Sequence, residues 1–192
     1  MMSQANFLER IIKKLESCGI KYMISGSLGS SFHGKPRATN DIDIVIDPDF
    51  HQLQTFIEIM GDDYYICPET AISALKKRTM FNIIDNITGW KADLIIRKNR
   101  PFSAEEFNRR IEADIIGVRA NATTAEDTII IKLEWARNAK SERQFNDALG
   151  VAVTRWESLD VEYMKKWAQE LGIGKWLDKL LLEAQKNSLS KE

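Results

Sequence analysis

The chain has 192 residues, of which 44% are hydrophobic and 29% charged, a composition typical of a folded globular protein. Its 27 lysine and arginine residues balance 28 acidic ones, which excludes a globally basic surface for nucleic acid or an anionic membrane. No apolar run approaches the roughly 20 residues of a membrane span, and the charged N-terminal stretch does not resemble a secretory signal, so we expect a cytoplasmic protein without a membrane partner.

The first half of the chain alternates between helical and strand patterns. Apolar residues at three- and four-residue steps from Phe7 to Leu15 predict a helix that ends at Gly19. Two β-rich runs at 79–85 and 90–96 flank a turn-like stretch and predict a hairpin. Further patterns predict strands at 21–24 and 41–46 and helices at 28–33 and 50–60.

The pattern becomes helical after residue 118. Thr123-Thr-Ala-Glu126 is a capping-box pattern that predicts the start of a helix, and more helices are expected at 142–153, 161–171 and 175–185. We therefore expect an α/β fold, a small mixed sheet flanked by helices and followed by a C-terminal helical bundle. The predicted domains are residues 1–120 and 121–192.

Two acids on the predicted strand at 41–46 indicate a metal site. Asp41 and Asp43 lie two residues apart, so their side chains share one face of the strand. Two carboxylates this close repel each other, and a divalent cation removes that penalty. Mg²⁺ prefers carboxylate oxygens together with substrate phosphates, so this pair suits a metal-assisted phosphate chemistry. The alternative is an exposed strand face with two solvated acids.

A possible phosphate-binding turn precedes these acids. Gly26-Ser27 follows a predicted strand and opens a short helix, where backbone N–H groups can hold phosphate oxygens. The whole stretch from Ser25 to Asp43 resembles the signature of nucleotidyltransferases of the DNA polymerase β superfamily, a Gly-Gly or Gly-Ser pair followed by Arg-x-Thr-x-Asp-x-Asp. Within it, the chain is most similar to the AbiEii-type branch, which includes toxins of bacterial toxin–antitoxin and phage-defence systems. Ser27 stands where many members have a second glycine.

The resemblance implies further site residues. It implies a third metal-binding carboxylate, for which Asp93 is our first choice and Asp85 the alternative. It also implies a lysine and a late aspartate near the nucleotide, which Lys132 and Asp147 match; otherwise these are a helix lysine and a surface acid. Arg37 either steadies the triphosphate or pairs with the acids.

The resemblance also implies an activity. Two Mg²⁺ ions held by Asp41, Asp43 and Asp93 would assist transfer of a nucleoside monophosphate from an NTP to an acceptor hydroxyl. The AbiEii-type likeness favours an RNA acceptor, such as the tRNA acceptor end, and an antitoxin protein as partner. A small antibiotic-like molecule or a protein hydroxyl is an alternative acceptor, and a catalytically silent nucleotide-binding module is an alternative function.

Overall fold

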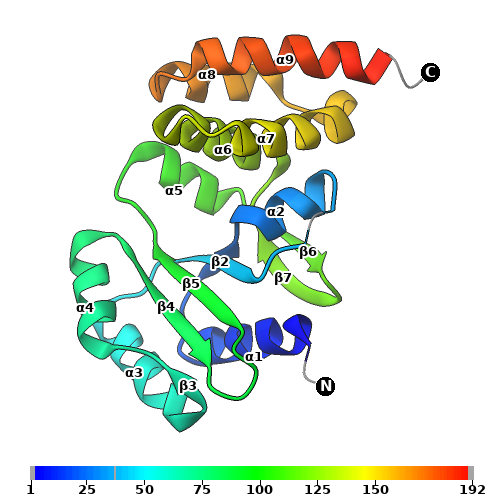
Figure 1. Ribbon diagram of the computed structural model, residues 1–192. Helices are drawn as coiled ribbons and strands as arrows, with labels where there is room; N and C mark the ends of the chain where they lie inside the picture. Colours follow the sequence, from blue (N-terminus) through cyan, green and yellow to red (C-terminus); the bar gives the residue numbers. More distant parts are fainter. Residues whose placement is uncertain (1–2, 37, 190–192) are drawn as a thin grey trace. The chain divides into compact units, whose positions relative to one another are not determined.

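The computed structural model describes residues 3–36 and 38–189, which form a mixed α/β fold (Figure 1). The elements follow in the order α1 (Gln4–Ser17), β1 (Tyr22–Ile24), α2 (Gly26–His33), β2 (Asp41–Ile46), α3 (Phe50–Met60), η1 (Gly61–Asp63), β3 (Tyr64–Tyr65), α4 (Pro68–Lys77), β4 (Met80–Asp85), β5 (Lys91–Ile96), α5 (Pro101–Asn108), β6 (Ile111–Ile115), β7 (Val118–Ala122), α6 (Ala125–Ala139), α7 (Glu142–Arg155), η2 (Trp156–Ser158), α8 (Val161–Glu170) and α9 (Gly174–Leu189). None of the helices in this part of the chain is both long and apolar enough to cross a membrane.

The strands form one seven-stranded mixed sheet in the order β3-β4-β5-β2-β1-β7-β6. The pairs β2–β5 and β1–β7 are parallel, and the remaining neighbours are antiparallel. The predicted α/β class with a small mixed sheet and a helical C-terminal part is therefore confirmed. The predicted hairpin is confirmed as β4 and β5.

The chain divides into two compact units. The first consists of Met1–Leu28 and Thr39–Ala122, and it contains the sheet with α1, α3, α4 and α5. The second consists of Gly29–Ala38 and Thr123–Glu192, and it contains the helices α6 to α9. The segment Gly29–Ala38, which includes most of α2, thus joins a unit whose other residues come about 85 positions later.

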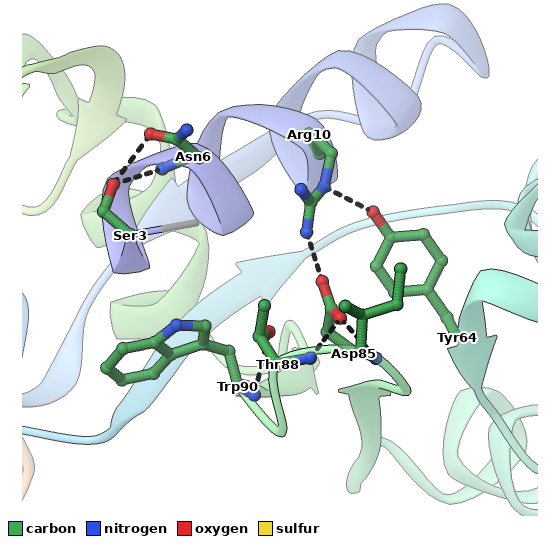
Figure 2. A network of polar contacts seen from close by, with 8 residues as sticks. Ser3, Asn6, Arg10, Tyr64, Asp85, Thr88 and Trp90 are labelled. Atoms are coloured by element: carbon green, nitrogen blue, oxygen red, sulfur yellow. Dashed lines mark hydrogen bonds and ion pairs between the residues drawn. The ribbon is translucent and has the colours of Figure 1, made fainter. Parts of the chain in front are cut away.

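Helix α1 shows how local sequence produces a packed element in the first unit. The Ser3 side chain accepts a hydrogen bond from the backbone N–H of Asn6 and so caps the helix (Figure 2). The chain leaves the helix at Gly19, whose φ of +65° suits glycine. One face of the helix is buried, namely Phe7, Leu8, Ile11, Ile12 and Leu15.

Asp85 connects the β4–β5 turn to α1 by hydrogen bonds and an ion pair, as Figure 2 shows. One of its carboxylate oxygens accepts hydrogen bonds of 2.9 Å from the backbone N–H groups of Ile87 and Thr88, and the other pairs with the Arg10 guanidinium. Arg10 also donates to the Tyr64 hydroxyl at 2.9 Å. Burial raises the pKa of Asp85, but these hydrogen bonds and the Arg10 charge outweigh it and hold the pKa below the ordinary value.

Helix α6 begins at a cap that lies one residue later than predicted. Thr124, not Thr123, is the N-cap of α6, and its side chain accepts from the backbone N–H of Asp127. Thr123 instead offers its carbonyl oxygen to the buried Nε2–H of His33, at 2.7 Å. Gly34 packs so closely on α7 that an added Cβ would lie 2.9 Å from the backbone nitrogen of Val151.

Candidate active site

Strand register brings the predicted carboxylates onto one face of the sheet. In the parallel pair β2–β5, Asp43 lies opposite Asp93 and Asp41 lies opposite Lys91. In the antiparallel pair β4–β5, Asn82 lies opposite Asp93. Because strand side chains alternate, the intervening residues face the other way, and Ile42, Ile44, Ala92 and Leu94 are fully buried there. The polar residues thus share one face because the apolar ones are required on the other.

Lys91 links two of these carboxylates. Its ammonium nitrogen lies 3.3 Å from Oδ1 of Asp41 and 3.3 Å from Oδ1 of Asp93. The Asp93 side chain is only 13% exposed, whereas those of Lys91 and Asp41 are 35% and 54% exposed. Burial lowers the pKa of Lys91, but hydrogen bonds and charge from Asp93 and Asp41 outweigh it and raise the pKa above its ordinary value.

Asp93 has a second partner on the neighbouring strand. The Asn82 side-chain amide donates a hydrogen bond to the same Asp93 Oδ1. Two donors on different strands therefore restrict the orientation of this carboxylate.

The β1–α2 turn lies directly against Asp43. The backbone N–H of Ser25 donates to the Asp43 carbonyl at 3.0 Å. Gly26 has a φ of +59°, and a Cβ added there would lie 1.9 Å from Oδ2 of Asp43. Only glycine fits this position, because any side chain would collide with the carboxylate. Ser27 follows in the first turn of α2, and the phosphate-binding role predicted for Gly26 and Ser27 stays a prediction.

The donor set is compatible with a hard cation. Within residues 3–36 and 38–189, no group of three or more His, Cys, Asp or Glu side chains is arranged to hold a metal ion. Asp41 and Asp93 nevertheless already converge on one positive charge, the Lys91 ammonium. Carboxylate oxygens are the ligands that Mg²⁺ prefers, so the chemistry of these residues fits such an ion.

Lys132 and Asp147 lie in the second unit and pair with each other. The Lys132 ammonium is 2.9 Å from Oδ2 of Asp147, and the two side chains are only 5% and 14% exposed. Lys132 is therefore not a snorkelling surface lysine, and Asp147 is not a solvated surface acid. Arg37, the other predicted nucleotide-binding residue, lies outside the described residues.

Lys91 and Asn82 are the site residues to which the sequence analysis assigned no role. The period-two rule could have found Lys91, because it precedes Asp93 by two residues on the same strand. To find Asn82, one must know which residues of the two hairpin strands lie opposite each other, and not only that the hairpin forms. That register depends on the length of the turn between the strands.

Comparison with known proteins identifies the fold. No model of a known protein family matches the chain, and no curated protein matches its sequence. The crystal structure of the antibiotic-resistance factor ANT(2'')-Ia in complex with adenylyl-2''-tobramycin is similar, with a TM-score of 0.59 and 14% identity over 88% of this chain and 97% of that chain. An antigenic nucleotidyltransferase-like protein from Paracoccidioides brasiliensis has a TM-score of 0.55 and 14% identity over 91% of each chain. The lincomycin-bound lincosamide antibiotic adenylyltransferase LnuA has a TM-score of 0.50 and 12% identity over 75% of this chain and 93% of that chain. The chain therefore has the nucleotidyltransferase fold.

Proposed function

We propose that the protein is an enzyme that transfers a nucleoside monophosphate from an NTP to an acceptor hydroxyl. The observation that carries this proposal is the β2–β5 register, which sets Asp43 opposite Asp93 with Asp41 on the same face. Gly26 lies against Asp43, where a bound triphosphate would meet the backbone N–H groups at the start of α2. Nucleotide transfer uses carboxylates that hold metal and a turn that holds phosphate, and the proposal places both at this end of the sheet.

Asp41, Asp43 and Asp93 are the residues that would hold the metal. Two Mg²⁺ ions bound there would neutralise charge on the phosphates and on the attacking and leaving oxygens. The chain's own contribution is to orient these acids: the Asn82 side-chain amide donates a hydrogen bond that fixes the Asp93 carboxylate. Asp43 or Asp93 would accept the proton of the acceptor hydroxyl.

Lys132 and Asp147 keep the nucleotide-binding role that the polymerase β resemblance implies for them. Lys132 would bring a positive charge to the triphosphate, and Asp147 would hold its side chain in one orientation through their 2.9 Å ion pair. Arg37 has a similar proposed role, in the stretch that resembles the polymerase β signature. We also retain the proposed domains, a catalytic core at 1–120 and a helical region at 121–192.

Different observations support two acceptor classes. Arg37-Ala-Thr-Asn-Asp41-Ile-Asp43 resembles the polymerase β signature, and within that superfamily the likeness to the AbiEii-type branch favours RNA, such as a tRNA end, with a toxin role and an antitoxin partner. The similarity to ANT(2'')-Ia with adenylyl-2''-tobramycin and to lincomycin-bound LnuA favours a small antibiotic-like molecule. A protein hydroxyl is a third acceptor, and a silent nucleotide-binding module is the alternative function.

One experiment tests the reaction and identifies the acceptor. The protein is incubated with each α-³²P-labelled NTP and Mg²⁺, together with total cellular RNA or a panel of aminoglycosides and lincosamides. Label on RNA supports the first class, and label on an antibiotic supports the second. Label on the protein itself points to a protein hydroxyl. Binding of NTP without transfer to any acceptor supports the silent module.

Single-residue variants test whether the proposed transfer depends on these carboxylates. Asp41→Asn and Asp93→Asn should each reduce transfer by about 100-fold or more, because they remove a metal ligand while changing the side-chain volume little. The control Asp62→Asn makes the same change at an exposed residue of η1 and should keep the wild-type rate. Wild-type transfer by Asp93→Asn would remove this residue from the proposed site.

A further inference from the structure

Lys91 occupies the position from which a cation contacts both Asp41 and Asp93. Its nitrogen is 3.3 Å from one oxygen of each, so the ammonium bridges the two acids. The register explains this placement, because Lys91 is the direct neighbour of Asp41 across β2–β5 and shares the strand face of Asp93. The chain therefore carries its own counter-ion for the acids that we propose as metal ligands.

A divalent ion and this ammonium compete for the same oxygens. Mg²⁺ prefers carboxylate oxygens, so a divalent ion held by Asp41 and Asp93 would compete with the Lys91 nitrogen for them. Two cations this close also repel each other. Lys91 has a flexible four-carbon chain and is 35% exposed, so its ammonium is able to withdraw from the carboxylates.

The withdrawn ammonium needs another anion. An NTP brings several negative charges to the same face of the sheet, next to Gly26 and Asp43 under the proposed function. Its phosphates offer Lys91 new hydrogen bonds in exchange for those to Asp41 and Asp93. Metal that arrives alone offers no such exchange. The competition is therefore strongest for metal without nucleotide.

We propose that Lys91 acts as a built-in competitor of the divalent metal, which weakens binding of metal alone and makes metal binding depend on nucleotide. This inference rests on the proposed function, because it concerns the same carboxylates. Lys91 is here a positioning residue: it holds Asp41 and Asp93 together until metal and nucleotide arrive. The consequence is cooperative loading of the two ligands.

Calorimetric titration with Mn²⁺ tests the competition without measuring activity. Lys91→Met should bind Mn²⁺ alone on the order of tenfold more tightly than wild type, because the competing charge is gone. A non-hydrolysable NTP analogue should strengthen Mn²⁺ binding in wild type and much less in Lys91→Met. Lys98→Met is the matched control, because it removes the same charge from an exposed residue just after β5 and should leave both affinities unchanged.

Thermal melting provides a second measurement. Metal-free Lys91→Met should melt below wild type, because Asp41 and Asp93 lose the shared counter-ion, and Mn²⁺ should raise its melting temperature more than that of wild type. Lys91→Gln keeps this half-exposed strand position polar and repeats both tests if Lys91→Met folds poorly.

The outcomes separate this inference from the proposed function. Mn²⁺ binding that is equal or weaker in Lys91→Met and Lys91→Gln, while wild type transfers nucleotide, overturns only the competition. Absence of Mn²⁺ binding in wild type and in both Lys91 variants overturns the competition, and absence of transfer in the labelling experiment overturns the proposed function. Tighter Mn²⁺ binding in the Lys91 variants supports the competition even if no acceptor is found.

Discussion

Replacing Gly26 with alanine tests the contact between the β1–α2 turn and Asp43. The added Cβ would lie 1.9 Å from Oδ2 of Asp43 and 2.5 Å from its Cγ. The carboxylate must move by about 1.1 Å to reach even the 3.0 Å limit of real Cβ contacts. The alanine must also adopt a φ of +59°, which costs about 1–2 kcal/mol for a residue other than glycine.

These two effects have different consequences. A misplacement of about 1 Å at a catalytic group reduces a rate by about 100-fold, so Gly26→Ala should lose most of its nucleotide transfer. The backbone strain alone lowers stability without moving a carboxylate. Gly89→Ala provides the control, because Gly89 has a φ of +73° and nothing within 4 Å of an added Cβ. It should lose only the stability that the backbone strain costs, about 1–2 kcal/mol, and keep its activity.

Transfer rates and chemical denaturation of both variants decide the matter. We expect Gly26→Ala to lose at least as much free energy of unfolding as Gly89→Ala, because it adds the collision to the same strain, and the rate to fall only in Gly26→Ala. If Gly26→Ala transfers nucleotide as fast as Gly89→Ala, then Asp43 either tolerates the displacement or takes no part in the reaction.

Two further predictions concern the second unit. Burial lowers the pKa of His33 despite its hydrogen bond to the Thr123 carbonyl, so the unfolded chain binds more protons than the folded one as pH falls below about 6.5. The free energy of unfolding measured by urea denaturation should therefore be lower at pH 5.5 than at pH 7.5. This difference should be smaller in His33→Gln and unchanged in the exposed control His51→Gln. A difference of wild-type size in His33→Gln would refute the role of His33. Lys132→Met should lower the free energy of unfolding by about 3 kcal/mol, because it removes the ammonium from the mostly buried Asp147 carboxylate. If urea denaturation shows that Lys132→Met loses less than about 0.5 kcal/mol of unfolding free energy, the Lys132–Asp147 pair contributes little to stability.

Local patterns predicted the elements whose signals are complete within a few residues. The alternation from Asp41 to Ile46 gave β2, and the helix expected at 50–60 is α3, which Asp49 and Gln52 cap reciprocally. Helices α4 and α5 were not predicted, although Pro68 and Pro101 stand at their first turns as helix-start signals. Nor were the strands β3, β6 and β7, of which β3 has only two residues and is defined by its pairing with β4.

The candidate site was also predictable only where local geometry determines it. The shared face of Asp41 and Asp43 follows from strand geometry alone. The position of Asp93 opposite Asp43 depends on parallel pairing between strands 50 residues apart, which no local pattern specifies, so Asp93 could be chosen only from the resemblance. Its role, like that of the other acids, stays a prediction. Asp85 was the alternative, and its hydrogen bonds to the turn and to Arg10 show what else an acid at a strand end can do.

The second unit is built from two segments that are far apart in the chain, and this affects how the protein folds during its synthesis. Gly29–Ala38 leaves the ribosome early, but the rest of its own unit begins only at Thr123, about 85 residues later. At about 5–20 residues per second, translation needs roughly 4–17 s to reach it. During that interval His33 and the Gly34 backbone, which pack against Thr123 and α7 in the finished fold, have no native surface to cover them. Chains that stop near residue 122 should therefore be prone to aggregation or to capture by chaperones, even when the sheet itself is fully synthesised.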